Sequence, residues 1–187
     1  MNNGQFKQKL DAFTKALVIE MPRINESVAM NAYALVKDRV INEGEIGTGK
    51  NLGSYSTNEL PTFFYKGKSL NQGGEKAIEK AKKEHKGLSY KDWRSANNLE
   101  TDHVSLSFTG QMWKDIGVTK QVVDGNKIIT TVGAKNTKNR DGKTTDDILG
   151  FNAERYGDVL TVNKTEETLI ARTYDVMLQQ LIDKNFG

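Results

Sequence analysis

The sequence contains no cysteine, which excludes disulfide bonds, thiolate chemistry and zinc sites that need sulfur ligands. It has only two histidines, His85 and His103, so we do not expect a metal centre built from several histidines. No apolar run approaches the roughly 20 residues that a membrane-spanning helix needs. The first ten residues also lack the apolar segment of a secretory signal. These absences predict a chain that is made in the cytoplasm and does not enter a membrane.

An excess of charge of one sign is also missing. The formal net charge is +3 over 187 residues, which is too small to indicate a nucleic-acid partner by itself. Hydrophobic residues make up 36% of the chain and the mean hydropathy is −0.61, a polar composition for a compact protein. We therefore expect one domain over residues 1–187, with part of the chain in exposed loops or awaiting a partner.

The N-terminal quarter has the spacing of helices. Apolar residues recur every three or four positions over residues 6–19, and again more regularly over residues 24–40. Pro22 lies between these stretches and fits the first turn of the second helix. Four glycines between positions 44 and 53 should end that helix. The pattern predicts two N-terminal helices.

The rest of the chain indicates a small sheet and further helices. Asp-Gly-Asn between two β-rich runs predicts a hairpin of Gly117–Asp124 with Lys127–Ala134. Alternation of Val104, Leu106 and Phe108 predicts a half-buried strand. Helices are expected over residues 75–86, 90–96, 146–158 and 165–184, with a helical turn after Thr109 and with Thr165 as N-cap of the last. The expected fold class is α+β: N-terminal helices, a small antiparallel sheet with a β-hairpin, and a C-terminal helix.

Residues 44–74 show no sustained period but are rich in aromatic side chains. Irregular segments of this length are usually functional or disordered, and the aromatic content argues against plain disorder. We interpret the segment as a long extended arm that packs on something, such as a neighbouring subunit. The candidate contact residues of this arm are Leu52, Tyr55, Phe63, Phe64 and Tyr65.

The stretch Gly44–Asn51, "GEIGTGKN", differs from a P-loop at its last position, where Asn51 replaces Ser or Thr. A P-loop follows a buried strand and opens a helix whose amides hold phosphate. Here the glycines follow a helix and lead into a segment with no helical pattern. The sequence therefore favours a flexible hinge for the arm, and no nucleotide or other cofactor is expected.

Glu100, Asp102 and His103 are close in sequence and raise the hypothesis of an acid–base or metal site in a hydrolase or nuclease. Neighbouring residues of a strand point to opposite faces, however, so Asp102 and His103 would diverge. No second histidine lies nearby. A structural role is the better interpretation, and the sequence predicts no catalytic, metal-binding or cofactor-binding residue and no enzyme.

The segment Lys66–Arg94 carries nine basic and four acidic residues, so its net charge is +5. Aromatic residues between them would allow single-stranded nucleic acid to bind by stacking. The candidate DNA-facing residues are Lys80, Lys82, Lys83, Lys86, Trp93 and Arg94. The alternative is that the charges pair along a solvated helix face. Nucleic-acid binding by residues 66–94 is thus the second functional hypothesis.

Four short fragments occur together in a recognisable order. They are "LGSYST" at residues 52–57, "YKDWR" at 90–94, "VSLSFTGQM" at 104–112 and "NAERYGDVL" at 152–160, the last followed by Glu166. As a set, this resembles the tail-completion or neck proteins of tailed bacteriophages, also described as head–tail joining or virion morphogenesis proteins. Two features depart from that pattern: no proline precedes the final helix, and the loop at 136–143 is longer and more charged.

The resemblance implies a structural virion protein at the phage head–tail interface, a ring subunit that joins the head connector to the tail. The implied partners are copies of itself, connector or adaptor proteins, tail proteins, and packaged DNA passing through the ring. The implied location is the neck or tail of the virion, and the host cytoplasm during assembly. The expected contact surfaces are the arm at 52–70 and the hairpin at 118–134.

Overall fold

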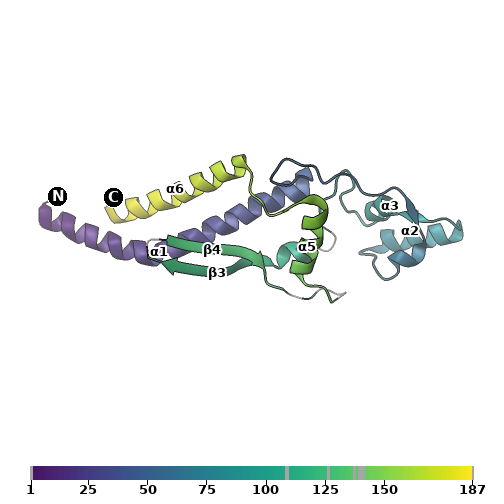
Figure 1. The fold of residues 1–187 in the computed structure, drawn as a ribbon, viewed down its shortest axis with the longest axis horizontal. Helices are drawn as coiled ribbons and strands as arrows, with labels where there is room; N and C mark the ends of the chain where they lie inside the picture. The colour runs from purple at the N-terminus through teal and green to yellow at the C-terminus, as the bar shows by residue number, and fades with distance from the viewer. Residues whose placement is uncertain (1, 108–109, 126, 137, 139–141, 187) are drawn as a thin grey trace.

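The computed structural model describes residues 2–107, 110–125, 127–136, 138 and 142–186, and the molecule is elongated (Figure 1). Helices α1 (Asn3–Asp38) and α6 (Lys164–Phe186) run side by side in opposite directions, and both chain ends lie at the same end of the molecule. We call α1, α6 and the hairpin beside them the stalk. Helices α2 (Gln72–Lys83) and α3 (Tyr90–Ala96) form a distal lobe at the other end.

Helix α1 is continuous, so the prediction of two N-terminal helices, with Pro22 starting the second, was wrong. Asn2 caps the helix, and Pro22 lies inside it. Proline removes one helical hydrogen bond, and α1 bends along its length (Figure 1). Packing against α6 and the hairpin keeps both halves helical, and the Gln121 side chain donates to the Pro22 carbonyl oxygen at 2.8 Å.

At its C-terminal end α1 widens into a π-helical turn, Arg39–Glu43. Gly44 follows with a φ of 68°, a left-handed conformation that glycine adopts without strain and that commonly ends helices. The glycines after residue 43 therefore do end the helix, as the sequence predicts. The turn places Arg39 and Val40, both buried, against the segments that follow.

The predicted hairpin is confirmed. Strand β3 (Ile116–Asp124) pairs antiparallel with β4 (Lys127–Ala134), with a bulge between Val118 and Lys120. The hairpin packs along α1 (Figure 1). A second, two-residue ladder joins β1 (Glu59–Leu60) to β2 (Leu88–Ser89) in the distal lobe.

The predicted strand at 103–108 was wrong: residues 103–107 form no strand, and Phe108 and Thr109 lie outside the described residues. Val104 and Ser105 are buried, but their amides bond to the Gly53 carbonyl oxygen at 2.8 Å and to the Tyr55 hydroxyl at 3.1 Å. These two hydrogen bonds to the segment at residues 53–55 take the place of the regular bonds between paired strands. Leu106, with a φ of 50°, further departs from extended backbone.

The remaining helices are α4 (Gln111–Lys114) and α5 (Thr145–Tyr156), and the α+β class is confirmed in the described residues. Thr165 is not the N-cap of α6, because the Asn163 side chain accepts the Glu166 amide at 2.8 Å instead. Thr144 and Asp147 form a capping box at the start of α5.

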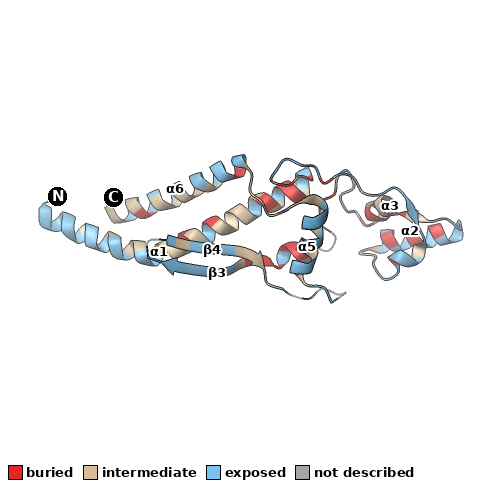
Figure 2. Ribbon diagram, in the orientation of Figure 1, coloured by how far each residue is buried: buried red, intermediate tan, exposed pale blue. Residues whose placement is uncertain are grey.

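Three separate apolar clusters run along the molecule (Figure 2). The main core joins the C-terminal part of α1 to α4, β3 and the neighbouring loops; its buried members are Val36, Val40, Ile46, Leu52, Val104, Met112, Trp113, Ile116 and Val159. The stalk core lies between α1 and α6 and has only Ile24, Val28 and Leu181 buried. The lobe core consists of Tyr65, Ile78 and Trp93.

Candidate interaction surfaces

Helix α1 continues its apolar stripe beyond the point where α6 ends. Phe13 and the apolar residues after it along the stripe pack against α6, and the Phe13 ring meets that of Phe186, the last residue of α6, at 5.2 Å. Phe6 and Leu10 belong to the same stripe by their spacing of three or four residues. They are 48% and 45% exposed. This end of α1 is exposed on most sides (Figure 2).

Helix α6 also divides its apolar residues between two faces. Ile170, Met177 and Leu181 pack against α1. Leu169 and Val176, seven residues apart, are exposed on the outer side of the helix. By their spacing these residues form one broad stripe, and a single neighbouring helix covers only part of it.

The hairpin exposes apolar residues as well. Val122 and Ile129 form a cross-strand pair, and both are exposed, as is Val123. The hairpin was predicted as a contact surface; the exposure of these three side chains agrees with that prediction without testing it.

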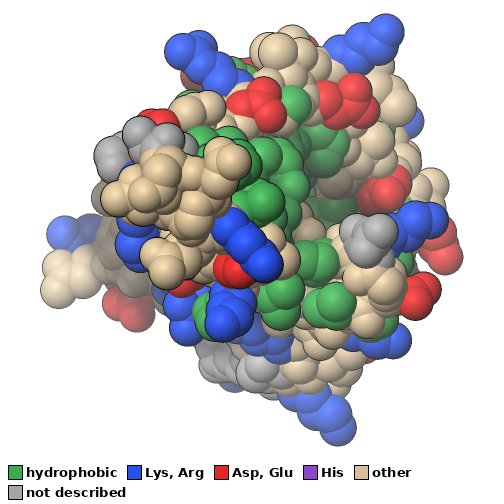
Figure 3. Space-filling view, turned by 90° about the vertical axis from the view of Figure 1, so that its left-hand side faces the viewer, with side chains coloured by type: hydrophobic (Ala, Val, Ile, Leu, Met, Phe, Trp, Pro, Cys, Tyr) green, Lys and Arg blue, Asp and Glu red, His purple; other side chains and the backbone are tan. Residues whose placement is uncertain are grey.

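Viewed from the end that holds both chain termini, hydrophobic side chains gather in a hollow in the middle of the face (Figure 3). The total accessible surface is also large. A compact monomer of 20.9 kDa would expose about 9,000 Å². This chain exposes 12119 Å². The excess of about 3,100 Å² reflects the elongated shape, with its three small cores in place of one.

An apolar groove of about 530 Å³ runs along the first half of α6. Val28, Val162, Ile170, Ala171 and Tyr174 form its apolar lining. Two acidic residues, Glu167 and Asp175, complete the lining, and both are exposed. We call this set of seven residues the α6 groove.

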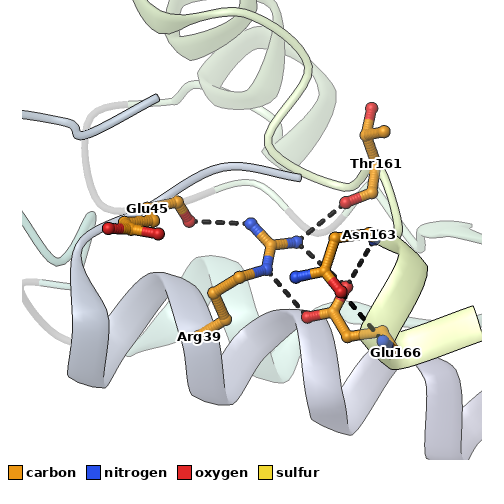
Figure 4. Close-up of polar contacts among 5 residues, drawn as sticks. All are labelled: Arg39, Glu45, Thr161, Asn163 and Glu166. Carbon is orange, nitrogen blue, oxygen red and sulfur yellow. Dashed lines mark hydrogen bonds and ion pairs between the residues drawn. The ribbon is translucent and has the colours of Figure 1, made fainter. Parts of the chain in front are cut away.

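A buried ion pair fixes the start of α6 to the end of α1 (Figure 4). Arg39 Nε donates to Glu166 Oε1 at 2.8 Å, and Arg39 Nη2 donates to Oε2 at 3.3 Å. The guanidinium also donates to the carbonyl oxygens of Glu45 and Thr161, each at 2.8 Å. Glu166 in turn accepts the Asn163 amide at 2.8 Å. Arg39 and Glu166 are each 5% exposed, so the pair is positioned inside the protein.

Two of the predicted arm contacts are wrong, because their side chains are buried within the subunit. Leu52 lies in the main core and Tyr65 in the lobe core. Tyr55 is partly buried, and its hydroxyl lies 3.3 Å from Ser105 Oγ. The arm is therefore anchored to the main core through Leu52 and to the lobe core through Tyr65, while most of the residues between them are exposed.

Phe63 and Phe64 are exposed, as a contact surface requires. Their rings stack at 4.4 Å, and they are 68% and 46% exposed. They belong to a 3-10 turn, Thr62–Tyr65, whose last residue anchors it in the lobe core. The predicted arm surface is thus reduced to this aromatic pair.

The predicted DNA-facing residues separate into two groups. Lys80, Lys82, Lys83 and Lys86 are exposed on α2 and the turn after it. In the described residues, Lys80 and Lys86 form ion pairs with Glu84 at 4.0 and 3.8 Å. Trp93 and Arg94 are only 1% and 2% exposed, so their prediction as DNA-facing was wrong.

Trp93 and Arg94 are buried because the aromatic residues of the lobe pack on one another. The Trp93 ring stacks between Tyr65 at 5.3 Å and Tyr90 at 5.6 Å. The Arg94 guanidinium lies 4.0 Å above the Tyr55 ring and donates to the carbonyl oxygens of Glu100 and Ser107. Tyr90 is a local partner, three residues before Trp93 in α3, whereas Tyr55 and Tyr65 come from the arm and are not signalled by local spacing.

The P-loop-like stretch is a closed turn. The amides of Ile46 and Gly49 bond within the turn, and that of Leu52 bonds to the Gly44 carbonyl oxygen, so these donors are used internally. Lys50 Nζ donates to the Tyr156 carbonyl oxygen at 3.1 Å. Ile46 and Leu52 pack in the main core, so the hinge interpretation is corrected to a fixed turn.

The Glu100 and His103 side chains bond to backbone groups of the protein. His103 Nε2 lies 2.7 Å from the Ile41 carbonyl oxygen. Glu100 accepts the amides of Thr101 and Asp102; the bond from Asp102 is the main reason that the pKa of Glu100 is lowered. Within the described residues, no group of three or more His, Cys, Asp or Glu side chains is placed to hold a metal ion.

Among the helices that the structure describes, none combines the length and the hydrophobicity needed to cross a lipid bilayer. Comparison of the chain with protein-family models, curated proteins and solved structures found no match.

Proposed function

We propose that this chain is a structural virion protein of the phage head–tail interface, a neck or tail-completion ring subunit that joins the head connector to the tail. The observation that carries the proposal is the uncovered apolar surface of the stalk, which includes Phe6, Leu10, Leu169 and Val176. Such a surface is stable in water when other protein chains cover it.

The surface area supports assembly over a solitary role. Obligate interfaces bury about 2,000–5,000 Å² in total. The excess of about 3,100 Å² over a compact monomer is of that size. An elongated subunit with apolar side chains along the stalk offers contacts to neighbours on two sides, which a ring requires.

The fragments that carry the resemblance occupy structural positions. Met112, after the Thr-Gly turn, is buried in the main core. Arg155-Tyr156-Gly157 ends α5 shortly before α6, and the Tyr156 ring packs on the main core. These residues thus pack in or next to the main core, near the end of α1 and the start of α6. A structural role for the fragments supports the proposal.

The alternative function, nucleic-acid binding, can no longer rely on bases stacking on Trp93. Trp93 is enclosed between Tyr65 and Tyr90, so its faces are not free for bases. The exposed lysines of α2 remain, and they would bind a phosphate backbone only through a salt-sensitive charge interaction. This surface suits passing contact with packaged DNA better than a dedicated binding site.

Immunogold labelling tests the proposal directly. Antibody against the chain is applied to tailed particles whose genome encodes it, and to particles of an unrelated phage as control. We expect gold at the head–tail junction of the first particles alone. Particles free of gold, with the chain left in the soluble fraction, would refute the virion role.

A further inference from the structure

The uncovered end of α1 and the α6 groove have complementary chemistry. The α1 tip, which we define as Phe6, Lys7, Lys9 and Leu10, presents two apolar side chains flanked by two lysines. Lys7 is exposed, and Lys9 Nζ reaches the Phe186 carbonyl oxygen at 3.3 Å. The α6 groove has an apolar lining with the carboxylates of Glu167 and Asp175 beside it. The basic, apolar chemistry of the α1 tip is thus complementary to the acidic, apolar chemistry of the α6 groove.

The two surfaces lie at different places on one chain. The α1 tip is at the end of the molecule that holds both termini, beyond the last residue of α6. The groove residues of α6 lie between Glu167 and Asp175, in the half of the helix farther from that end. A subunit whose tip occupies a neighbour's groove keeps its own groove open for the next copy. Such a head-to-tail contact forms rings when its rotation closes.

We infer that the α1 tip of one copy inserts into the α6 groove of the next copy, and that this contact links the subunits of the ring. The occupant of the groove is thus a second copy of this chain. The inference rests on the proposed assembly into a ring, and it adds which surfaces meet. It gives the exposed side chains of Phe6 and Leu10 a packing partner in another subunit.

Two variants each remove one side of the contact. Phe6→Asp places a charge in the α1 tip, at the N-terminal end of a helix where an acidic residue is tolerated. Ala171→Arg fills the α6 groove with a residue that favours helix and repels Lys7 and Lys9. The matched controls are Val18→Asp, at an α1 residue that is 74% exposed, and Gln179→Arg, at an exposed residue of α6 outside the groove.

Light scattering during size-exclusion chromatography measures the result. We expect the wild-type chain and both controls to form oligomers larger than dimers. Phe6→Asp and Ala171→Arg should each remain monomeric, because loss of an anchor residue weakens a contact by roughly 30-fold or more. Circular dichroism should show unchanged helix content. The inference is overturned if either variant assembles as the wild type does, or if the wild-type chain stays monomeric.

Mixing the two variants gives the sharpest outcome. The Ala171→Arg chain retains an intact tip and the Phe6→Asp chain retains an intact groove, so one contact can form between them and none beyond it. We expect dimers of one copy each and nothing larger. Continued monomers, or rings as large as those of the wild type, would overturn the inference.

Cross-linking locates the contact independently, and the absence of cysteine gives a clean background. Chains with Leu10→Cys and chains with Ala171→Cys are mixed and treated with a short bis-maleimide. We expect mixed dimers, identified by mass, whereas Leu10→Cys mixed with Lys82→Cys of the distal lobe should give none. Equal yields would overturn the inference. If gold labels the junction but this cross-link fails, the proposed function stands and the ring contact lies elsewhere.

Discussion

The stalk and the distal lobe place their apolar side chains differently. In the lobe, Trp93 stacks between two tyrosines and is 1% exposed, while the lysines of α2 face solvent. In the stalk, the charged pair of Arg39 and Glu166 is buried, while Phe6 is 48% exposed. The lobe thus completes its own small core. The stalk has both a buried ion pair and a small apolar core, and several of its apolar side chains remain exposed.

The largest expected effect is that of Trp93→Ala, which removes the central ring of the lobe core. We expect a loss of about 4 kcal/mol in the free energy of unfolding. Hydrogen exchange should locate the loss in α2 and α3, with α1 and α6 still protected. Phe63→Ala, at a residue that is 68% exposed, is the control and should cost less than about 0.5 kcal/mol. An equal loss of hydrogen-exchange protection in the stalk and the lobe would contradict the view that the lobe has its own core.

Glu166→Ala should act on the stalk. It leaves the buried Arg39 guanidinium without its carboxylate, at an expected cost of about 3 kcal/mol in denaturant unfolding. The neighbouring Glu167→Ala removes an exposed carboxylate and should change stability by no more than about 0.5 kcal/mol. Similar costs for both variants would show that the buried pair does not hold the stalk.

Gly47→Ala tests the turn that joins the stalk to the main core. A Cβ atom at this position would lie 2.2 Å from the Thr161 carbonyl oxygen, so backbone must move, at about 2 kcal/mol. Gly49→Ala meets no atom within 4 Å but must adopt a φ of 78°, which costs about 1 kcal/mol. Thermal unfolding of the two variants should rank them in this order. The reverse order would indicate that the turn is not packed against residue 161.

The last expected effect is alkaline destabilisation, which appears only at high pH. Burial raises the pKa of Tyr33 from its ordinary value of 10.0 to about 12. The folded state therefore keeps a proton that the unfolded state releases, so stability falls as the pH rises from about 10 to about 12. Burial, with the charges of Tyr90 and Asp92, also raises the pKa of Tyr65 in the lobe.

Phenylalanine variants separate these two contributions in urea unfolding measured across that pH range. Tyr33→Phe should flatten the alkaline decline more than Tyr65→Phe does, because the larger shift is that of Tyr33. Tyr156→Phe, at a residue outside both sites, serves as the control for the exchange of a tyrosine. A decline that survives in both variants would assign it to other groups.

The sequence correctly predicted the elements of the fold that depend on local patterns. The hairpin follows from the Asp-Gly turn between β-rich runs, and the last helix from its apolar spacing. Pro22 misled the prediction, since tertiary packing on two sides of α1 outweighed the loss of one helical hydrogen bond. The strand predicted at 103–108 failed because alternation alone supplies no partner strand.

The candidate sites depended on contacts that are distant in sequence. Arg39 and Glu166 are 127 residues apart, and no sequence pattern pairs them. Trp93 and Arg94 were assigned to a charged, solvated segment, although rings from other segments enclose them.

Because α1 is long, a small rotation at one end produces a large displacement at the other. Its 36 residues span about 54 Å along the helix, so a rotation of about 5° at one end moves the other by about 5 Å. The Arg39 pairing lies near one end of α1, and the α1 tip lies at the other. A small rotation around the Arg39 guanidinium would therefore displace the α1 tip by several ångströms. The angle at which successive subunits would meet is set deep inside each one.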